Sequence, residues 1–495
     1  MLFVLAGCTV VGPEFEAPET QAPADWSSPL LEGLESEAAQ LSEWWKVFDD
    51  PLLEELIQQA KENNNGLEIA ALRTLEAQAQ LGVATGLQYP QGQFATGEAT
   101  WISPPNSSSV NNSYWRYGLA GVASWEIDFW GRFKRGIESA DAAYLGSLAA
   151  FDKATVLLTA TVADTYIIIR TLQRRLEIAN ENVALQQRSF EITEVQFRNG
   201  ADSELDMQQA NTLLLATQAT VPVLQTSLKQ SLNALATLLG LPPGTLDQKL
   251  ISSSGIPALP ERVNVGYPAD MLRLRPDVRE AEMLAMAQNA LVGLAEADLY
   301  PSFTLTGSIG LSAGGPGSSS FGDLFSGDAL SVSIGPSFVW PFLNYGRIKN
   351  NIRVQDARLQ QALIAYRETA LQAAREAEDA IVAYTGAQQQ ARILEKTVQS
   401  AVRSNEISTL RYQEGFSDYQ RVLDAQQALF TQQQRLVDAR GSSVRSLVSL
   451  YKALGGGWQS RAGAPAPGSQ TRQQMEARTD WGDLIPSVSE TPQQD

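Results

Sequence analysis

The residue types that most enzymes use for acid–base and metal chemistry are scarce in this chain. Its 495 residues include no histidine and one cysteine. Without histidine there is no imidazole general base, no Ser-His-Asp triad and no histidine-ligated metal. A lone cysteine can form neither an intramolecular disulfide nor a zinc cluster, and no G-x-x-x-x-G-K-[ST] loop or strand-linked G-x-G-x-x-G occurs. We therefore expect a protein that is not an enzyme, with no catalytic residues, no metal site and no cofactor.

The single cysteine, Cys8, closes the apolar stretch Leu5-Ala6-Gly7-Cys8. Small residues before a cysteine fit a signal-peptidase pocket, so the stretch resembles a bacterial lipobox, in which the cysteine becomes the lipidated first residue. A covalent lipid on Cys8 would anchor the chain to a membrane without spanning it, and Thr9 in place of Asp favours the outer membrane. None of the seven preceding residues is Lys or Arg, a departure from the usual signal. The alternative is an incidental cysteine in an apolar N-terminus.

The charge of the chain restricts its partners. The formal net charge is −18 and the pI is near 4.6. Nucleic acids and anionic lipid surfaces attract basic patches, so the overall charge disfavours both. An acidic chain suits a water-filled cavity that admits cations, although a merely solvated acidic surface has the same composition. No run of 18 or more apolar residues occurs, so we expect no transmembrane helix.

An internal repeat organises the whole chain. LQYP at 87–90 matches DLYP at 298–301, and VQFRNG at 195–200 matches LRYQEG at 410–415. The offset is 211 residues for the first pair and 215 for the second and most later matches, so the two halves should share one architecture. The predicted parts are a lipobox and N-terminal extended segment (1–50), repeat 1 (51–241), a connector (242–267), repeat 2 (268–455) and a disordered tail (456–495). Repeat 1 should contain a helix at about 51–88, a β-hairpin at 91–130 and long helices at 132–240. Repeat 2 should contain a helix at about 268–299, a hairpin at 302–343 and long helices at 347–454.

The long helices carry a coiled-coil pattern. From Leu158 to Phe197, twelve positions follow a strict 4-3 spacing, and nine of them are apolar. A helix of 68 residues would be roughly 100 Å long. A soluble coiled-coil rod is the alternative reading of this feature alone. Pro222 should kink its helix or mark a break.

The strand segments indicate a membrane. In PSFTLTGSIGLSA (301–313) the apolar residues fall on one face and Thr, Ser and Gly on the other. Aromatic residues gather near the strand ends, as in the girdles of outer-membrane barrels. The residues that we expect to face lipid are Trp115, Trp125, Phe129, Leu305 and Trp340. A soluble sandwich is the alternative; in lipid, four strands per chain cannot close a barrel, so several copies would have to pool theirs.

Several stretches together carry a family resemblance: LAGCTVVGPEFEAP, WWKVFDDPLLEELIQQA, LRPDVREAE, LYPSFTLTGSIG, WPFLNYGRIKNNI and RYQEGFSDYQRVLDAQQALF. The chain resembles the outer-membrane factors, the TolC/OprM/NodT-like channels of Gram-negative tripartite efflux and secretion systems, and within them the lipoprotein branch. The resemblance implies an α+β membrane protein. Three copies would form a homotrimer with a 12-stranded outer-membrane β-barrel continuous with a periplasmic α-helical coiled-coil barrel. The implied function is passive export of drugs or other small molecules. The implied partners are a periplasmic adaptor, an inner-membrane pump of the RND type and outer-membrane lipid, with no nucleic acid.

The resemblance also implies roles for residues near the periplasmic aperture. Asp424 matches a position that contributes to a carboxylate ring at the constriction, while Asp206 and Tyr412 match positions that hold neighbouring helices shut. Gly200 and Gly415 lie in turns that would contact the adaptor. Arg421 replaces a second acidic position of the family. The alternative for Asp206 and Asp424 is that they are solvated residues at helix starts, and the alternative for the turns at Gly200 and Gly415 is an ordinary Gly-capped turn. For the whole chain, the alternative is a lipid-anchored coiled-coil scaffold without an open pore.

Overall fold

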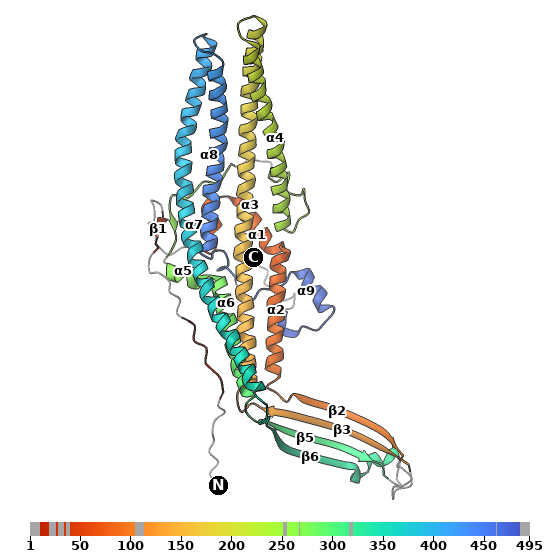
Figure 1. The fold of residues 1–495 in the computed structure, drawn as a ribbon. Helices are drawn as coiled ribbons and strands as arrows, with labels where there is room; N and C mark the ends of the chain where they lie inside the picture. The colour runs from red at the N-terminus through yellow and green to blue at the C-terminus, as the bar shows by residue number, and fades with distance from the viewer. Residues whose placement is uncertain are drawn as a thin grey trace. The chain divides into compact units, whose positions relative to one another are not determined.

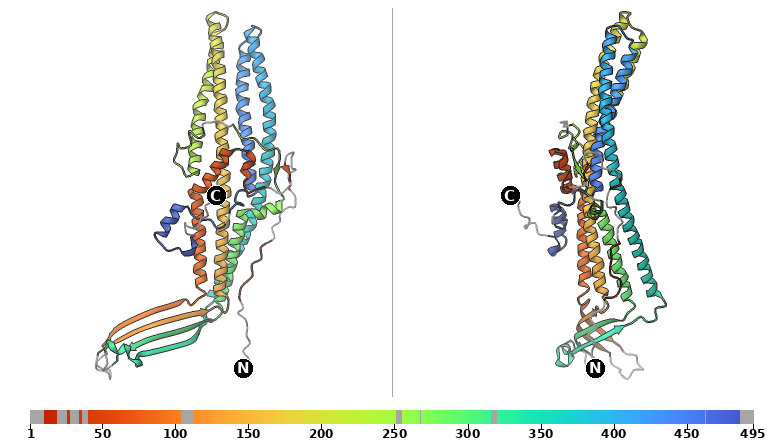
Figure 2. Two further views of the ribbon diagram at one scale, coloured as in Figure 1. Left: turned by 180° about the vertical axis from the view of Figure 1, so that it is seen from behind. Right: turned by 90° about the vertical axis from the view of Figure 1, so that its left-hand side faces the viewer.

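A computed structural model describes residues 10–18, 26–27, 34–35, 40–103, 113–250, 255–266, 268–315, 320–461 and 463–485. The chain divides into two compact units, each built from three stretches (Figures 1 and 2). Unit 1 comprises 1–19, 73–148 and 280–368, and unit 2 comprises 20–72, 149–279 and 369–495. Each unit is described by itself.

Unit 1 contains one antiparallel sheet. Its strands are β2 (Gly92–Ile102), β3 (Tyr114–Ile127), β5 (Ser302–Ala313) and β6 (Leu330–Val339), in the spatial order β2-β3-β5-β6. The two predicted hairpins therefore pair with each other through β3 and β5. Two 3₁₀ turns, η2 (Phe321–Phe325) and η3 (Gly327–Ala329), precede β6. This sheet has four strands, as the alternating segments predict.

The helices that lead into the strands are each interrupted where the sequence predicts one continuous helix. The first is split into α1 (Pro51–Asn63) and α2 (Asn65–Gly86), and the second into α5 (Pro268–Leu274) and α6 (Pro276–Ala297). Asn64 is extended and its side chain accepts from the Leu67 amide at 3.0 Å, which starts α2. Pro276 has no N–H to continue α5. Arg275, at that break, is buried and bonds Asp277, Glu376 and the Ala453 carbonyl at the end of α8 (Gln420–Ala453).

The long helices match their predicted ranges closely. They are α3 (Arg132–Arg198), α4 (Glu204–Leu238), α7 (Arg347–Gln413) and α8, and Figure 1 shows α3–α4 and α7–α8 as two antiparallel pairs. The 4-3 seam positions Val162, Ile169 and Ala179 are fully or almost fully buried. A core cluster in unit 2 joins these helices to η1 (Trp44–Phe48), where Trp44 stacks on Tyr451 at 5.3 Å. A two-residue parallel ladder links β1 (Leu34–Glu35) to β4 (Val263–Asn264).

Two features of these helices differ from expectation. Helix α4 continues through Pro222 without a break, because the proline is exposed and the carbonyl that it leaves unpaired can bond water. Among the described residues, α3 is long and apolar enough to cross a membrane by length and composition, although no such helix is expected from the sequence. Because 61% of its most apolar window is buried inside the chain, it is a core helix here.

The tail, expected to be disordered over 456–495, is folded as far as it is described. It contains α9 (Ser469–Glu476) and η4 (Gly482–Leu484), and buries Met475 and Ile485. Arg461 forms a bidentate ion pair with the buried Asp152 of α3, at 2.6 and 3.1 Å. The expectation was wrong because it rested on the local Gly, Pro and Gln content of the tail. The start of the tail is instead held by Asp152, which is about three hundred residues away in the sequence.

We predict that Arg461→Ala lowers the apparent Tm by a few degrees, because it leaves the buried Asp152 carboxylate unpaired at a cost of about 3 kcal/mol. Burial already raises the pKa of Asp152 against the lowering effect of Arg461, so the variant should raise it further. A carboxyl with a raised folded pKa destabilises the fold when ionised, so the deficit should be largest at neutral pH and shrink as pH falls through that raised pKa.

Thermal unfolding followed by circular dichroism at several pH values measures both effects. Arg478→Ala is the matched control, since Arg478 is an exposed tail arginine whose side chain donates to the Gln474 carbonyl at 3.0 Å. An Arg461→Ala protein as stable as that control at pH 7 would contradict the assigned role.

Candidate functional site

The register of the sheet separates an apolar face from a polar face. Trp125 of β3 lies opposite Leu305 of β5, and Ile309 of β5 lies opposite Val332 of β6. Because neighbours across strands share a face, the pairing collects most of the large apolar residues on one side; Phe94, Ile102, Tyr114, Val122 and Val339 lie on the other. The apolar face comprises Gln93, Ala95, Gly97, Ala99, Trp101, Trp115, Tyr117, Leu119, Gly121, Ala123, Trp125, Ile127, Phe303, Leu305, Gly307, Ile309, Leu311, Ala313, Leu330, Val332, Ile334, Pro336 and Phe338.

The opposite face is mostly small and polar. It carries Thr304, Thr306 and Ser308 of β5 beside Ser331, Ser333 and Ser337 of β6, and Ser308 and Ser333 hydrogen-bond across the strands at 3.0 Å. Glu98 and Arg116 add charges on this side, near the far end of β2 and β3. Such a face is stable against water, whereas the apolar face is not: Ile334, Val332 and Phe338 are 76%, 67% and 66% exposed.

Aromatic side chains form two belts on the sheet. At the loop end, Trp101, Trp115, Tyr117 and Phe321 contact one another with ring centroids 5.3–6.0 Å apart. At the helix end, the indoles of Trp125, Trp130 and Trp340 donate to the carbonyls of Gln88, Pro301 and Leu299 at 2.9–3.0 Å. Ten residues separate Trp115 from Trp125, about 33 Å of strand, or about 25 Å of height at a tilt near 40°. This is the height of the apolar band of a membrane barrel.

The five residues expected to face lipid are all at this site. Trp115, Trp125 and Leu305 lie on the apolar face, while Phe129 and Trp340 lie just beyond the ends of β3 and β6. Among the described strands, β2 and β6 each have one edge without a partner strand. The sheet therefore has an unpaired row of backbone groups at both sides.

The tips of the two helix pairs have the same backbone geometry. Gly200 and Gly415 have φ of 73° and 77°, the left-handed region in which glycine is unstrained. In each turn the glycine amide bonds the carbonyl three residues back, and the next amide bonds the carbonyl five residues back (2.8–3.0 Å). These are Schellman caps. A Cβ at either glycine would meet no atom within 4 Å, so both turns are open to solvent.

Tyr412 connects the two tips within the chain. Its hydroxyl lies at the end of α7 and hydrogen-bonds Asp202 and Gln196, in and beside the turn after α3. Its ring contacts Tyr419 at 5.4 Å. Burial and then the Asp202 carboxylate raise the pKa of Tyr412, so the hydroxyl stays protonated and donates throughout the physiological range. Sequence reasoning selected Tyr412 but missed Asp202, which no local pattern marks.

The two expected aspartates occupy different environments. Asp206 forms a reciprocal capping box with Ser203 at the start of α4. Burial of Tyr419 and, to a smaller extent, the negative charge of Asp206 raise the pKa of Tyr419 to about 12. Asp424 is exposed on α8 and accepts from Gln420 at 2.9 Å. Arg421 lies one turn before Asp424, exposed and 3.9 Å from Asp418. Asp206 therefore acts locally as a helix cap, and Asp424 presents its carboxylate to the surface of the chain.

Near the tips, the interface between α3 and α8 is polar. Asn182 bonds Gln433 at 2.7 Å, and Gln426 bonds Ser189 at 2.6 Å. Gln186 is 1% exposed and neither of its amide atoms has a partner in the described structure. Buried amide pairs set register more than they add net stability. Sequence reasoning placed Gln186 in the apolar seam and missed its polar neighbours across the interface.

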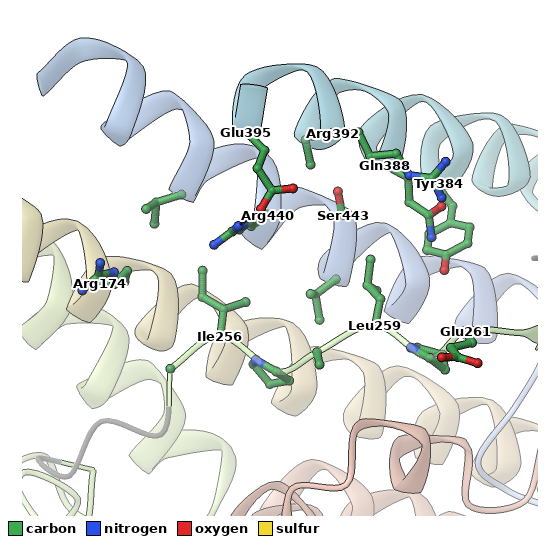
Figure 3. Close-up of a pocket in the computed structure, with 17 residues that line it drawn as sticks. Arg174, Ile256, Leu259, Glu261, Tyr384, Gln388, Arg392, Glu395, Arg440 and Ser443 are labelled. Carbon is green, nitrogen blue, oxygen red and sulfur yellow. Dashed lines mark hydrogen bonds and ion pairs between the residues drawn. The ribbon is translucent and has the colours of Figure 1, made fainter. Parts of the chain in front are cut away.

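A cavity of about 650 Å³ lies in unit 2 between α3, α7, α8 and the segment 255–261 (Figure 3). Its charged lining includes Arg174, Arg392, Arg440, Glu261 and Glu395, and Figure 3 shows Arg440 beside Glu395, with which it forms an ion pair. The residues that the structure describes include no group of three or more His, Cys, Asp or Glu side chains placed to hold a metal. The cavity is thus a charged groove beneath the connector, separate from the sheet and the tips.

Comparison with known proteins agrees with this arrangement. The sequence profile of the outer membrane efflux protein family matches twice, over residues 56–241 and 268–456. Nodulation protein T of Rhizobium leguminosarum bv. trifolii is 31% identical over 458 residues, covering 92% of this chain and 96% of that protein. The pyoverdine export outer membrane protein OpmQ of Pseudomonas putida is 32% identical, covering 88% and 92%.

A solved structure of the outer-membrane channel OprN superimposes with a TM-score of 0.85 at 31% identity, covering 91% of this chain and 99% of that one. Both profile matches span a long helix pair and a strand hairpin of the structure described above. The chain therefore belongs to the outer membrane efflux protein family and is an outer-membrane efflux channel.

Proposed function

We propose that three copies of the chain assemble into one channel, with their twelve strands closed into a barrel in the outer membrane. The observation that carries this proposal is the four-stranded sheet with one apolar face and two unpaired edges. In hydrocarbon each unpaired backbone group costs several kcal/mol, so the edges must pair with strands of other copies. The apolar face then meets lipid, and the Ser/Thr face lines water.

The helices extend this conduit into the periplasm as a coiled-coil barrel. We assign it passive transport of drugs or other small molecules, energised by an inner-membrane pump of the RND type through a periplasmic adaptor. The adaptor would contact the tips around Gly200 and Gly415, whose turns are open to solvent. The lipid anchor is assigned to Cys8, which lies outside the described residues.

The channel is built from two copies of one ancestral unit. Three pairs of glycines 215 residues apart have positive φ at corresponding places: Gly131 and Gly346 before α3 and α7, Gly200 and Gly415 after them, and Gly240 and Gly455 after α4 and α8. Helices α3 and α7 both have 67 residues. Duplication explains why the family profile matches twice.

The periplasmic aperture is assigned to the tips. Three Asp424 carboxylates around the channel axis would repel one another, attract cations and narrow the entrance. Tyr412 would hold the α7–α8 tip against the α3–α4 tip through Asp202, with Asp206 maintaining the start of α4. Arg421 would make this ring less acidic than a ring with two carboxylates per chain.

The central test is assembly and conduction. Protein extracted from membranes in detergent should have three times the chain mass and should conduct ions in planar bilayers. Ile309→Arg, in the middle of the apolar face, should abolish both, since an Arg at the bilayer midplane costs about 2–4 kcal/mol per copy. Ser308→Arg, its neighbour on the polar face, is the matched control and should still assemble. A monomer that needs no detergent, or a trimer without current, would exclude the channel and favour a scaffold.

Asp424→Ala should raise single-channel conductance by about twofold or more and reduce cation selectivity, because it removes the ring of repelling carboxylates. Asp379→Ala, which removes an exposed carboxylate of α7 that lies 4.0 Å from Arg375, should change neither the conductance nor the selectivity. Planar-bilayer recordings at low salt give both quantities. Conductance equal to wild type would leave Asp424 as a surface residue.

Tyr412→Phe should increase the open probability roughly tenfold, because a hydrogen bond to a charged group contributes about 1.5–3 kcal/mol. Tyr419→Phe is the matched control, since it keeps the ring contact at the same tip and leaves the Tyr412–Asp202 bond intact. The measurement is the fraction of time that single channels spend open. If the two variants behave alike, Tyr412 does not latch the tips.

A further inference from the structure

A group of five basic residues lies at the start of the two longest helices of this acidic chain. Arg132 and Lys134 open α3, and Arg347, Lys349 and Arg353 open α7. No Asp or Glu occurs between 347 and 355, in a chain whose net charge is −18. All five residues belong to unit 1, the unit that contains the sheet. We call these five residues the basic collar.

The collar cations are weakly engaged by the rest of the chain. Arg132 has carboxylates at 3.5 and 3.8 Å, and Lys134 has one at 3.9 Å, with side chains 45% and 57% exposed. Exposed ion pairs of this kind contribute little to the free energy of folding. On α7, Arg347, Lys349 and Arg353 are exposed, and Arg353 donates to the side-chain oxygen of Asn350 at 3.0 Å. Arg135 is a contrast: it is 2% exposed and bonds both Glu14 and Glu138.

Cations at these positions oppose the helix dipole. The N-terminus of a helix carries a partial positive charge, so acidic residues are favoured there and basic residues are disfavoured. Helices α1, α4 and α6 follow this rule with acidic residues in the first turn, whereas α3, α7, α8 and α9 have none. The collar cations of the first turns, which are all but Arg353, therefore lower the stability of the isolated chain, and an external anion would offset that cost.

The aromatic belt indicates which anion lies at this level. Trp125, Trp130 and Trp340 are pinned where the helices meet the strands, and aromatic belts of this kind sit at the membrane–water interface. Arg347 follows Trp340 by seven residues. The collar of α7 covers about 9 Å of helix, similar to the roughly 5–8 Å of headgroup region on one side of a bilayer. Long Lys and Arg side chains can reach back along that distance.

We propose that the basic collar binds the phosphate groups of phospholipids in the periplasm-facing leaflet of the outer membrane. This rests on the proposed function, because it requires the apolar face of the sheet to lie in lipid. Along the chain, strand β6 is followed by Trp340 of the aromatic belt and then by the cations of α7. The overall negative charge disfavours anionic lipid, but within about one Debye length of the surface the local charge decides.

The proposal is tested on the assembled channel in dodecyl maltoside by measuring the apparent Tm with added lipid. Phosphatidylglycerol should raise the apparent Tm of wild type by several degrees. Diacylglycerol, which has the same chains without phosphate, and inorganic phosphate, which has no chains, should each give less than half of that shift. The double variant Lys349→Gln/Arg353→Gln should lose at least half of the phosphatidylglycerol shift.

The control is Lys396→Gln/Arg403→Gln, which removes the same charge from the exposed surface of α7 farther along and should keep the full shift. A full shift in the collar variant, or an equal shift with diacylglycerol, would overturn the proposal. The proposal would also be overturned if the collar variant changed the ion selectivity of the channel but kept the full Tm shift with phosphatidylglycerol, because the cations would then lie in the pore. In each case wild-type trimer and current would remain, whereas their absence would refute the proposed function itself.

Discussion

Backbone hydrogen bonds that have no water to replace them constrain this molecule more than any other interaction. Each chain supplies four strands whose pairing leaves the outer edges of β2 and β6 open. In water these edges would be hydrated at little cost, but in hydrocarbon they would not be. The apolar face is therefore stable only in contact with lipid, and in lipid the edge strands need partner strands. A single chain cannot satisfy both requirements, which is why the proposed assembly is argued from the sheet and not from the helices.

The helical part meets a different requirement. A conduit through water needs no apolar exterior, so the long helices bury a seam and leave much of their surface polar. The seam changes along its length: Val162 and Ile169 pack as an apolar core, while Asn182, Gln186 and Gln426 replace that core near the tips. Apolar packing resists separation, and amide contacts can exchange with water. The tips are thus joined by hydrogen bonds, including that of Tyr412, together with a small apolar cluster of Ala210, Tyr412, Tyr419 and Val422.

The charged residues are distributed unevenly, which the net charge of the chain does not show. The net charge of −18 belongs to the whole chain, yet five cations gather where α3 and α7 begin. The proposed basic collar is compatible with the negative net charge, because ionic screening limits the reach of exposed charges to about 8–10 Å. Arg135 and Arg275 show the other use of arginine in this chain. Both are buried and bond carboxylates and backbone carbonyls that join separate segments.

The sequence by itself determined the features that depend on local periodicity. Alternation at 301–313 assigned the two faces of β5, and the 4-3 spacing assigned the buried seam of α3, since side-chain direction follows directly from the strand and helix repeats. Motif order along the chain was sufficient to assign the family. The tertiary structure decided what depends on residues distant in sequence. The Asp152–Arg461 pair orders a tail that its composition describes as disordered, Asp202 is the partner of Tyr412, and Gln426 of α8 meets Ser189 of α3. Such contacts leave no periodic signal, because either partner alone is an ordinary polar residue on a helix or in a turn.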